Sequence, residues 1–378
     1  MKPPWQNSLL GFDLQELTAI VEEMGEPSFR GQQLFEAIYR QRIESVEEVS
    51  TLSRELRRGL DRQGYSVGSP DIQRKFTSSD GTIRYLISFA DGQTVETVWM
   101  PEGDGGEAGD GTESDLPTEF STRPWHRATI CVSSQIGCAV DCQFCLTALL
   151  GMKRNLSAGE IVGQVCTVLN DQRVFPPEDR TNLVFMGMGE PFLNYDNFIK
   201  AVRLLVKGVG IPESRMTVST AGIVPRIYDL GAEHIRPKLA ISLNAANDEL
   251  RDLLMPINRK WNIAKLITAA RDFPLRSREK LTFEYVLLDG VNDAPEHASQ
   301  TAELMRGLRA KVNLIALNPG PGIDFRTPSD AQVLRFQEIL TRAGVPAFVR
   351  RPRGRDIFAA CGQLKQTIEI PENLSSVH

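Results

Sequence analysis

The chain has 378 residues, of which 41% are hydrophobic and 24% are charged, so it can bury a substantial core spread over two or three domains. The formal net charge of −5 argues against a general nucleic-acid binder, because such proteins usually carry a basic surplus. The opening MKPPWQNSLLGF lacks a signal-peptide pattern, and no stretch approaches the roughly 20 apolar residues that cross a bilayer. We therefore expect a cytoplasmic protein with no membrane partner.

Residues 1–66 predict a separate helical domain. Asp13 can cap a helix because Glu16 follows three residues later, and apolar residues then recur at helical spacing as far as Met24. Two further helical patterns follow, RGQQLFEAIYRQ at 30–41 and SRELRRGLDRQ at 53–63.

Residues 67–101 predict a small antiparallel β extension. Two short strand patterns, IRYLISF at 83–89 and TVETVWM at 94–100, are separated by turn signals. Residues 102–124 are rich in glycine, acidic and small polar residues. Such a composition cannot bury enough apolar surface to order itself, so a flexible loop is expected there.

Residues 125–365 alternate short β-rich runs with amphipathic helical patterns, which is typical of an α/β fold built from repeated βα units. A barrel or part-barrel is expected, with its active site at the carboxyl ends of the strands. The predicted strands are 128–133, 182–187, 216–220, 238–243, 281–288, 312–318 and 346–351. The predicted helices are 157–169, 197–207, 248–254, 298–309 and 331–344. Residues 366–378 form a tail.

Three closely spaced cysteines predict a metal site. Cys138, Cys142 and Cys145 have C-x3-C-x2-C spacing, which lets three thiolates converge on one inorganic group, either zinc or an iron–sulfur cluster. Structural zinc normally takes four protein ligands, and the sequence offers no obvious fourth. A four-iron cluster held by three cysteines would leave one iron open to a substrate or cofactor. Cys166 is most simply a buried small side chain.

Six segments together carry a resemblance to a known family. They are CVSSQIGC at 131–138, GMGEP at 187–191, STAG at 219–222, SLNA at 242–245, LNPGPG at 317–322 and RGRDIFAACGQL at 353–364. This set resembles the RlmN type of RNA adenosine C2-methyltransferases in the radical S-adenosylmethionine (SAM) superfamily, over nearly the whole chain. The resemblance implies a partial (β/α)6-type radical SAM barrel and a helical accessory domain.

The resemblance also implies two cofactors and the residues that hold them. Cys138, Cys142 and Cys145 would bind one [4Fe-4S] cluster whose open iron binds SAM. The matching SAM-binding positions are Gly189, Glu190, Ser219, Ser242, Leu243, Asn244 and Asn318. SLNA departs from the commoner SLHA, so Asn244 would contact SAM through an amide.

Three catalytic residues follow from the same resemblance. Cys361 would carry the methyl group: one SAM methylates its sulfur, and a second SAM yields a radical that activates the S-methyl group for addition to C2 of an adenine. Cys131 would attack the carrier sulfur to release the product, leaving a disulfide. Glu96 would accept the C2 proton, although the Cys131 thiolate could also serve.

The implied partners are 23S rRNA and tRNA, in which the targets are a specific adenosine of the rRNA and the adenosine next to the anticodon in certain tRNAs. A flavodoxin-like electron donor and a dithiol reductant such as thioredoxin would supply electrons. We expect a monomer, with residues 1–66 and the cations between Arg350 and Arg355 gripping phosphates. Two alternatives remain: a Cfr-like C8-methyltransferase of 23S rRNA adenosine, and a non-catalytic RNA-binding protein stabilised by zinc.

Overall fold

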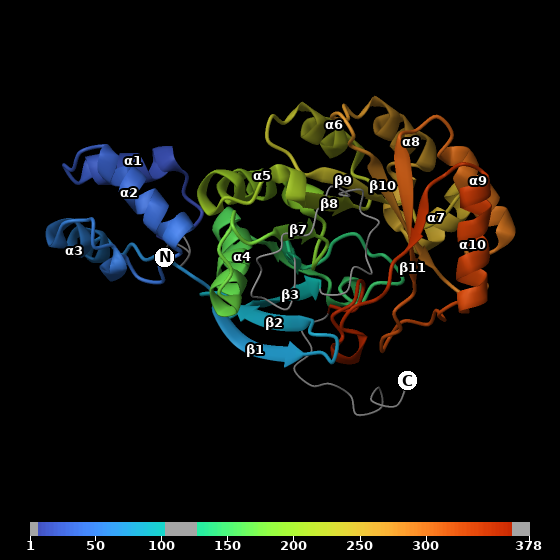
Figure 1. Ribbon diagram of the computed structural model, residues 1–378, viewed down its shortest axis with the longest axis horizontal. Helices are drawn as coiled ribbons and strands as arrows, with labels where there is room; N and C mark the ends of the chain where they lie inside the picture. The colour runs from blue at the N-terminus through green and yellow to red at the C-terminus, as the bar shows by residue number, and fades with distance from the viewer. Residues whose placement is uncertain (1–6, 103–126, 365–378) are drawn as a thin grey trace.

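The structure is a computed structural model that describes residues 7–102 and 127–364 (Figure 1). The predicted loop at 102–124, apart from its first residue, and the predicted tail at 366–378 lie outside the described residues. No helix in the described ranges is long and apolar enough to span a bilayer.

The N-terminal segment is helical, as predicted. It contains α1(Leu14–Glu23), α2(Phe29–Glu36), the π-helical η1(Ala37–Gln41), the 3-10 helix η2(Val46–Glu48) and α3(Arg54–Arg62). The Asp13 carboxylate accepts a hydrogen bond from the Glu16 backbone at 2.9 Å, and the Glu16 carboxylate accepts one from the Asp13 backbone at 2.7 Å, which is the expected capping box. This segment docks on the rest of the chain through Arg42, which donates to Asn170 and to the Val174 carbonyl.

The main sheet of the described residues has ten strands in the order β1-β2-β3-β4-β7-β8-β9-β10-β11-β12. The first three are β1(Asp71–Thr77), β2(Ile83–Ser88) and β3(Thr94–Glu102). The others are β4(Arg127–Cys131), β7(Thr181–Phe185), β8(Met216–Thr220), β9(Lys238–Ser242), β10(Leu281–Leu287), β11(Ala310–Ala316) and β12(Ala347–Val349). Strands β4 to β12 of this sheet pair in parallel. The predicted partial barrel is therefore present.

The predicted antiparallel element is also present, but it is not a sheet of its own. Strand β3 pairs antiparallel with β4, so β1, β2 and β3 continue the barrel sheet at one edge. This pairing sets Val98 directly opposite Cys131. A segment that the sequence marks as separate thus supplies one wall beside the first barrel strand.

The larger helices after β4 lie on the outer face of the curved sheet (Figure 1). They are α4(Ala158–Gln172), α5(Tyr195–Leu204), α6(Val224–Ala232), α7(Asp248–Leu254), α8(Ile263–Asp272), α9(Pro295–Leu304) and α10(Asp330–Arg342). Of these, α6 and α8 fall outside the predicted helices. The sequence did not predict α6 because it contains Pro225 and Gly231, and both residue types break helices in most contexts.

Short elements surround the cysteine-rich segment. The hairpin of β5(Gln135–Gly137) and β6(Met152–Asn155) brackets it, with η3(Ala148–Leu150) inside. The remaining short helices are η4(Pro191–Asn194), η5(Leu205–Val209), η6(Glu213–Arg215), η7(Pro256–Arg259) and η8(Arg355–Ile357).

Candidate active site

Cys138, Cys142 and Cys145 lie on the loop between β5 and β6 and line one cavity, here called the cysteine-loop cavity. The loop is closed by backbone hydrogen bonds from Cys138 to the Gly151 carbonyl at 3.2 Å and from Cys145 to the Cys142 carbonyl at 3.1 Å. Among the described residues, no three His, Cys, Asp or Glu side chains converge closely enough for a single metal ion. The three thiols instead face a shared space.

Burial controls the acidity of these thiols. It raises the pKa of Cys138 to about 12, and it raises the pKa of Cys142 well above its ordinary value, with a further contribution from Cys145. Buried thiols lose their protons only when a positive charge is supplied nearby. A cationic metal centre in the cysteine-loop cavity would supply that charge.

Most of the predicted SAM-binding positions line the same cavity as the three cysteines. They are Gly189, Glu190, Ser219, Ser242, Asn244 and Asn318. Leu243 is the exception: its side chain is fully buried, it is absent from the lining, and its backbone N–H donates to the Glu284 carbonyl at 2.9 Å. Any role of Leu243 therefore lies in its backbone.

Glu190 is a buried carboxylate held in place by two backbone donors. It accepts hydrogen bonds from the N–H groups of Ala221 at 2.7 Å and Phe192 at 3.0 Å. Burial raises its pKa from 4.5 to about 7. Gly189 beside it has φ +97°, and a Cβ there would lie 2.5 Å from the Gln135 side chain. Only glycine fits, so the backbone can approach a ligand closely.

Ser219 and Ser242 meet around Glu284, a residue not predicted from the sequence. The Ser219 hydroxyl donates to the Glu284 carboxylate, and the Ser242 hydroxyl lies 3.2 Å from that of Ser219. Burial raises the pKa of Glu284. A lone acidic residue inside the apolar strand LTFEYVLL is the sequence signal that would have found it, because a carboxylate on such a strand needs a partner.

The side-chain amides of Asn244 and Asn318 differ in whether their hydrogen-bonding atoms already have partners. Asn244 accepts from the Val286 N–H at 2.8 Å and donates to the Met255 sulfur at 3.2 Å, so both ends of its amide are engaged. Its expected amide contact with SAM stays a prediction that these bonds do not favour. Asn318 donates to the Cys361 carbonyl at 3.2 Å, while its buried Oδ1 has no hydrogen-bond partner among the described residues.

Cys131 and Cys361, 230 positions apart in the sequence, line one larger cavity of about 460 Å³. Cys131 ends β4 and is buried, whereas Cys361 is exposed. Burial, together with the nearby Cys361 thiol, raises the pKa of Cys131. All six cysteines are free thiols. Cys361, Glu284 and Asn318 also line the cysteine-loop cavity, so Cys361 stands where the two cavities meet.

Two sets of hydrogen bonds hold the loop that carries Cys361. On one side, the Leu146 N–H donates to the Gly362 carbonyl at 2.8 Å and the Thr147 hydroxyl donates to the Leu364 carbonyl at 2.6 Å. On the other side, the turn between β1 and β2 binds it, since the Asp80 carboxylate accepts from the Gly354 N–H at 3.0 Å. The antiparallel extension thereby anchors the Cys361 loop.

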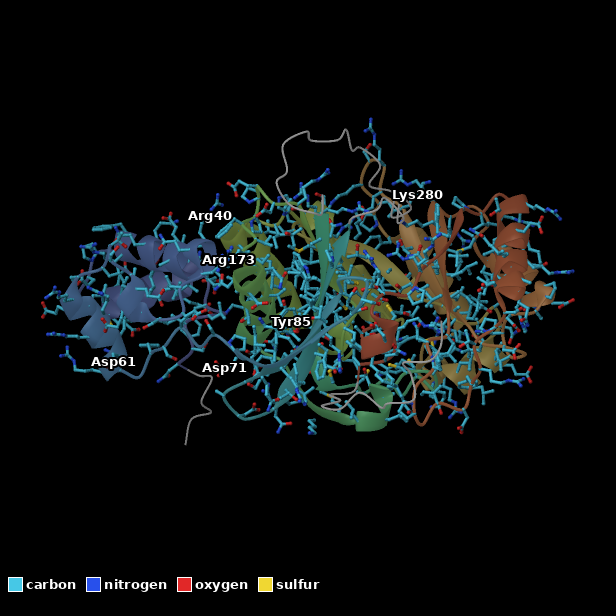
Figure 2. The ribbon with its side chains drawn as sticks, turned by 60° about the horizontal axis from the view of Figure 1, so that its bottom comes forward. Arg40, Asp61, Asp71, Tyr85, Arg173 and Lys280 are labelled. Carbon is cyan, nitrogen blue, oxygen red and sulfur yellow. The ribbon has the colours of Figure 1, made fainter. Side chains whose placement is uncertain are left out.

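The larger cavity has a strongly cationic lining, and we call it the basic cavity. Its cations are Arg127, Arg215, Lys238, Arg278, Lys280, Lys311, Arg350, Arg351 and Arg353, against the two carboxylates Glu279 and Glu284. Several stand at the amino ends of the parallel strands, opposite the end that bears the cysteine loop. Arg278 and Lys280 are exposed and mark where the cavity reaches solvent; Figure 2 shows Lys280 at the surface.

Glu96 is the predicted catalytic residue that lines neither cavity. Its side chain is fully buried in an ion pair with Arg84, whose guanidinium lies 4.1 Å from the Phe76 ring centre. Among the described residues that line either cavity, Glu96 is absent. It is two positions from Val98, the residue opposite Cys131.

Comparisons with known proteins assign the family. The domain family described as "Radical SAM superfamily" matches residues 132–302, and the "Ribosomal RNA large subunit methyltransferase N-terminal domain" matches residues 7–65. A Koribacter versatilis protein named "Probable dual-specificity RNA methyltransferase RlmN" is 63% identical over 92% of this chain and 98% of its own length. The chain belongs to the RlmN family of radical SAM methyltransferases.

A further relative and a solved structure agree. A Syntrophobacter fumaroxidans protein named "Dual-specificity RNA methyltransferase RlmN" is 46% identical over 93% of this chain and 96% of its own length. The crystal structure of a radical SAM methyltransferase from Sphaerobacter thermophilus matches with a TM-score of 0.83 at 40% identity, over 95% of this chain and 99% of that chain. The predicted family, fold and enzyme class are confirmed, and the non-catalytic zinc alternative loses its support.

The residues present fit the two cofactors that the superfamily implies. Four thiols and no histidine line the cysteine-loop cavity among the described residues: Cys138, Cys142 and Cys145 on one loop, and Cys361 from a late loop. The three thiols on one loop suit an iron–sulfur cluster with three protein ligands. The same cavity offers the Glu190 carboxylate and the unpartnered Oδ1 of Asn318. These are acceptors for the ammonium and hydroxyl groups of SAM.

Proposed function

We propose that this protein methylates C2 of a specific adenosine in 23S rRNA and of the adenosine next to the anticodon in certain tRNAs. The methyl group would pass through an S-methylcysteine at Cys361, with two SAM molecules used per turnover. One observation carries the proposal: Cys131 and Cys361 share the basic cavity, and Cys361 also borders the cysteine-loop cavity. The names of the relatives support the RNA substrates.

Each cofactor has proposed protein ligands. Cys138, Cys142 and Cys145 would hold the [4Fe-4S] cluster, which when bound supplies the electron for reductive cleavage of SAM. SAM would be held by Glu190, Ser219, Ser242 and Asn318, with Gly189 allowing close approach and with Leu243 and Asn244 shaping the wall. Cys361 borders the same cavity.

Cys361 carries the methyl carbon and Cys131 releases it. Once the carbon is bonded to C2 of the base, the Cys131 sulfur attacks the Cys361 sulfur. A disulfide forms, the carbon–sulfur bond breaks, and its electron pair stays on the carbon, which takes up a proton. Two electrons from a dithiol reductant such as thioredoxin then restore both thiols. The shared cavity supports this exchange because the two sulfurs need to meet.

Removal of the C2 proton is proposed for Glu96 or Cys131. Glu96 forms a buried ion pair with the Arg84 guanidinium. Cys131, however, lines the basic cavity and Glu96 does not. The geometry favours Cys131 as the group that reaches the base, unless the Glu96 side chain leaves its ion pair.

RNA would enter through the basic cavity. Arg350, Arg351 and Arg353 of the predicted cluster line it, whereas Arg355 does not. A buried reaction site requires the target base to be splayed out of its stack, and cations at the mouth can hold the flanking phosphates. Residues 7–65 match an N-terminal domain of ribosomal RNA methyltransferases and are proposed to add contacts. Binding should weaken as salt rises.

The remaining partners follow from the chemistry. We propose a flavodoxin-like electron donor for the cluster, action as a monomer, and a cytoplasmic location where RNA substrates and reduced thiols coexist.

Mass spectrometry of RNA nucleosides tests the proposal. Anaerobically reconstituted protein, with about four irons, SAM and a reductant, should convert adenosine to 2-methyladenosine in 23S rRNA and in tRNA. The variant Cys361→Ala should abolish this product while 5′-deoxyadenosine still forms. Appearance of 8-methyladenosine would instead establish the Cfr-like alternative, and a colourless protein holding one zinc would overturn the radical mechanism.

A further inference from the structure

Asn313 is a buried amide in the wall of the basic cavity. It lies on β11, paired in register with Glu284 on β10 and with Phe348 on β12. It is 9% exposed, and its Oδ1 has no hydrogen-bond partner in the described part of the chain. It lines the basic cavity and is absent from the lining of the cysteine-loop cavity. Neither the SAM contacts nor the thiol chemistry uses it.

An unpartnered oxygen at this depth needs an explanation. Buried polar atoms are almost always hydrogen-bonded, since leaving one unsatisfied carries the full cost of its desolvation. Its neighbour Glu284 accepts a hydrogen bond from Ser219, and a carboxylate has only acceptor oxygens, so it offers no donor to the Asn313 oxygen. The missing donor is therefore expected from whatever occupies the basic cavity.

The chemistry of the molecule that occupies the basic cavity limits which group can donate a hydrogen bond to Asn313. The cavity that holds Cys131 and Cys361 must admit the target adenine under the proposed function, on which this inference rests. In RNA the only N–H donor of adenine is its 6-amino group, whereas guanine and uracil present a carbonyl oxygen at the corresponding position. Enzymes that act on splayed-out bases read them by hydrogen bonds to such edge groups.

We propose that Oδ1 of Asn313 accepts a hydrogen bond from the 6-amino group of the target adenine, so that Asn313 determines which base is methylated. The other amides of the basic cavity are placed differently. Asn318 binds the Cys361 loop, and Asn182 lies near the start of β7 and is partly exposed. Asn318 also has an unpartnered Oδ1, but it lines the cysteine-loop cavity as well, where it is proposed to hold SAM; Asn313 lines the basic cavity and not the cysteine-loop cavity.

A substrate change paired with a mutation tests this contact. Two tRNAs are compared, one with adenosine next to the anticodon and one with purine riboside there, which lacks the 6-amino group. The wild-type protein should lose roughly tenfold in kcat/KM on the purine tRNA, the effect of one hydrogen bond. Asn313→Ala should act equally on both tRNAs. Its formation of 5′-deoxyadenosine from SAM without RNA should match that of the wild type.

Two further variants keep the test decisive. Asn313→Asp retains an oxygen acceptor and should keep the preference for adenosine, and Asn182→Ala, an amide in the same cavity, should keep it too. A tenfold preference that persists in Asn313→Ala, or that vanishes in Asn313→Asp, would overturn the inference. Failure of the wild-type protein to methylate either tRNA or 23S rRNA would instead refute the proposed function itself.

Discussion

The Asn318 side chain donates a hydrogen bond to the carbonyl oxygen of Cys361 at 3.2 Å. Asn318 lies just after β11 and lines both cavities, as Cys361 does. One amide thus ties the loop of the proposed methyl carrier to the barrel, while its Oδ1, which is unpartnered among the described residues, is the atom proposed to bind SAM. The two functions can be separated because they use different atoms of the same side chain.

Replacing Asn318 by aspartate should separate them in practice. Asn318→Asp keeps an oxygen acceptor and loses the N–H donor, so SAM cleavage without RNA should persist while methyl transfer falls roughly tenfold or more. Asn318→Ala should impair both reactions. The measurements are 5′-deoxyadenosine and 2-methyladenosine formation. Methyl transfer by Asn318→Asp at the wild-type rate would show that this bond does not position Cys361.

Loss of the second thiol should arrest the enzyme after RNA is attached. In Cys131→Ala no sulfur can attack Cys361, so a covalent protein–RNA adduct should accumulate and be visible on a denaturing gel. Cys166→Ala is the matched control, because Cys166 is buried on α4 and lines neither cavity among the described residues. Multiple turnovers by Cys131→Ala would remove Cys131 from the release step.

Removing one partner of the buried Arg84–Glu96 ion pair should strongly lower stability, because the other charge is left buried without compensation. Glu96→Gln leaves the guanidinium without its carboxylate and should lower the free energy of unfolding by roughly 3–5 kcal/mol. Glu338→Gln, which breaks the exposed pair with Arg342, should cost less than about 1 kcal/mol. Urea unfolding measures both. Equal losses in the free energy of unfolding for the two variants would mean that burial does not strengthen the dependence of Arg84 on Glu96.

A double variant separates the structural role of Glu96 from a catalytic one. Arg84→Met combined with Glu96→Leu removes both buried charges and should recover much of the lost stability. If this stable double variant still methylates RNA at the wild-type rate, Glu96 is not the proton acceptor and Cys131 takes that role.

Glu190 should make stability depend on pH. Its pKa is raised by burial from 4.5 to about 7, so between these values the folded protein keeps a proton that the unfolded chain has released. The free energy of unfolding therefore falls as pH rises through this window. Glu190→Gln cannot titrate, and its stability relative to the wild type should grow by roughly 3 kcal/mol from pH 4.5 to above pH 7.

Urea unfolding of the SAM-free protein at several pH values from 4.5 to 8 measures this difference. A constant offset between Glu190→Gln and the wild type reports the altered hydrogen bonds to Ala221 and Phe192 and does not affect the test. A difference that stays flat with pH would contradict the raised pKa.

Local patterns in the sequence predicted the elements well. The capping box at Asp13 and Glu16 marked the start of α1, and the alternation of strand and helix patterns after residue 125 predicted the parallel sheet. The spacing of Cys138, Cys142 and Cys145 indicated a shared site because all three lie on one short loop. Each of these signals depends on residues within a few positions of one another.

The other features of the site could not be predicted, because they depend on residues that are far apart in the sequence. Glu284 and Asn313 read as polar residues within apolar strands, and only the register of β10 and β11 shows that they stand side by side in the barrel wall. Leu243 matched a SAM-binding motif, yet its side chain, just after β9, is buried in the core. Glu96 was named as a proton acceptor, and the structure pairs it with Arg84 on β2 and leaves it out of the lining of both cavities.

The sequence by itself determined the family, the alternation of strands and helices after residue 125, and the trio of thiols on one loop, because these depend on short-range spacing. Only the tertiary structure decided that Cys131 and Cys361 share a cavity, that the turn at Asp80 anchors the Cys361 loop, and that cations gather at the opposite end of the barrel. The physical reason is that closing the sheet brings together strand ends and loops whose separation in the sequence carries no record of their contact.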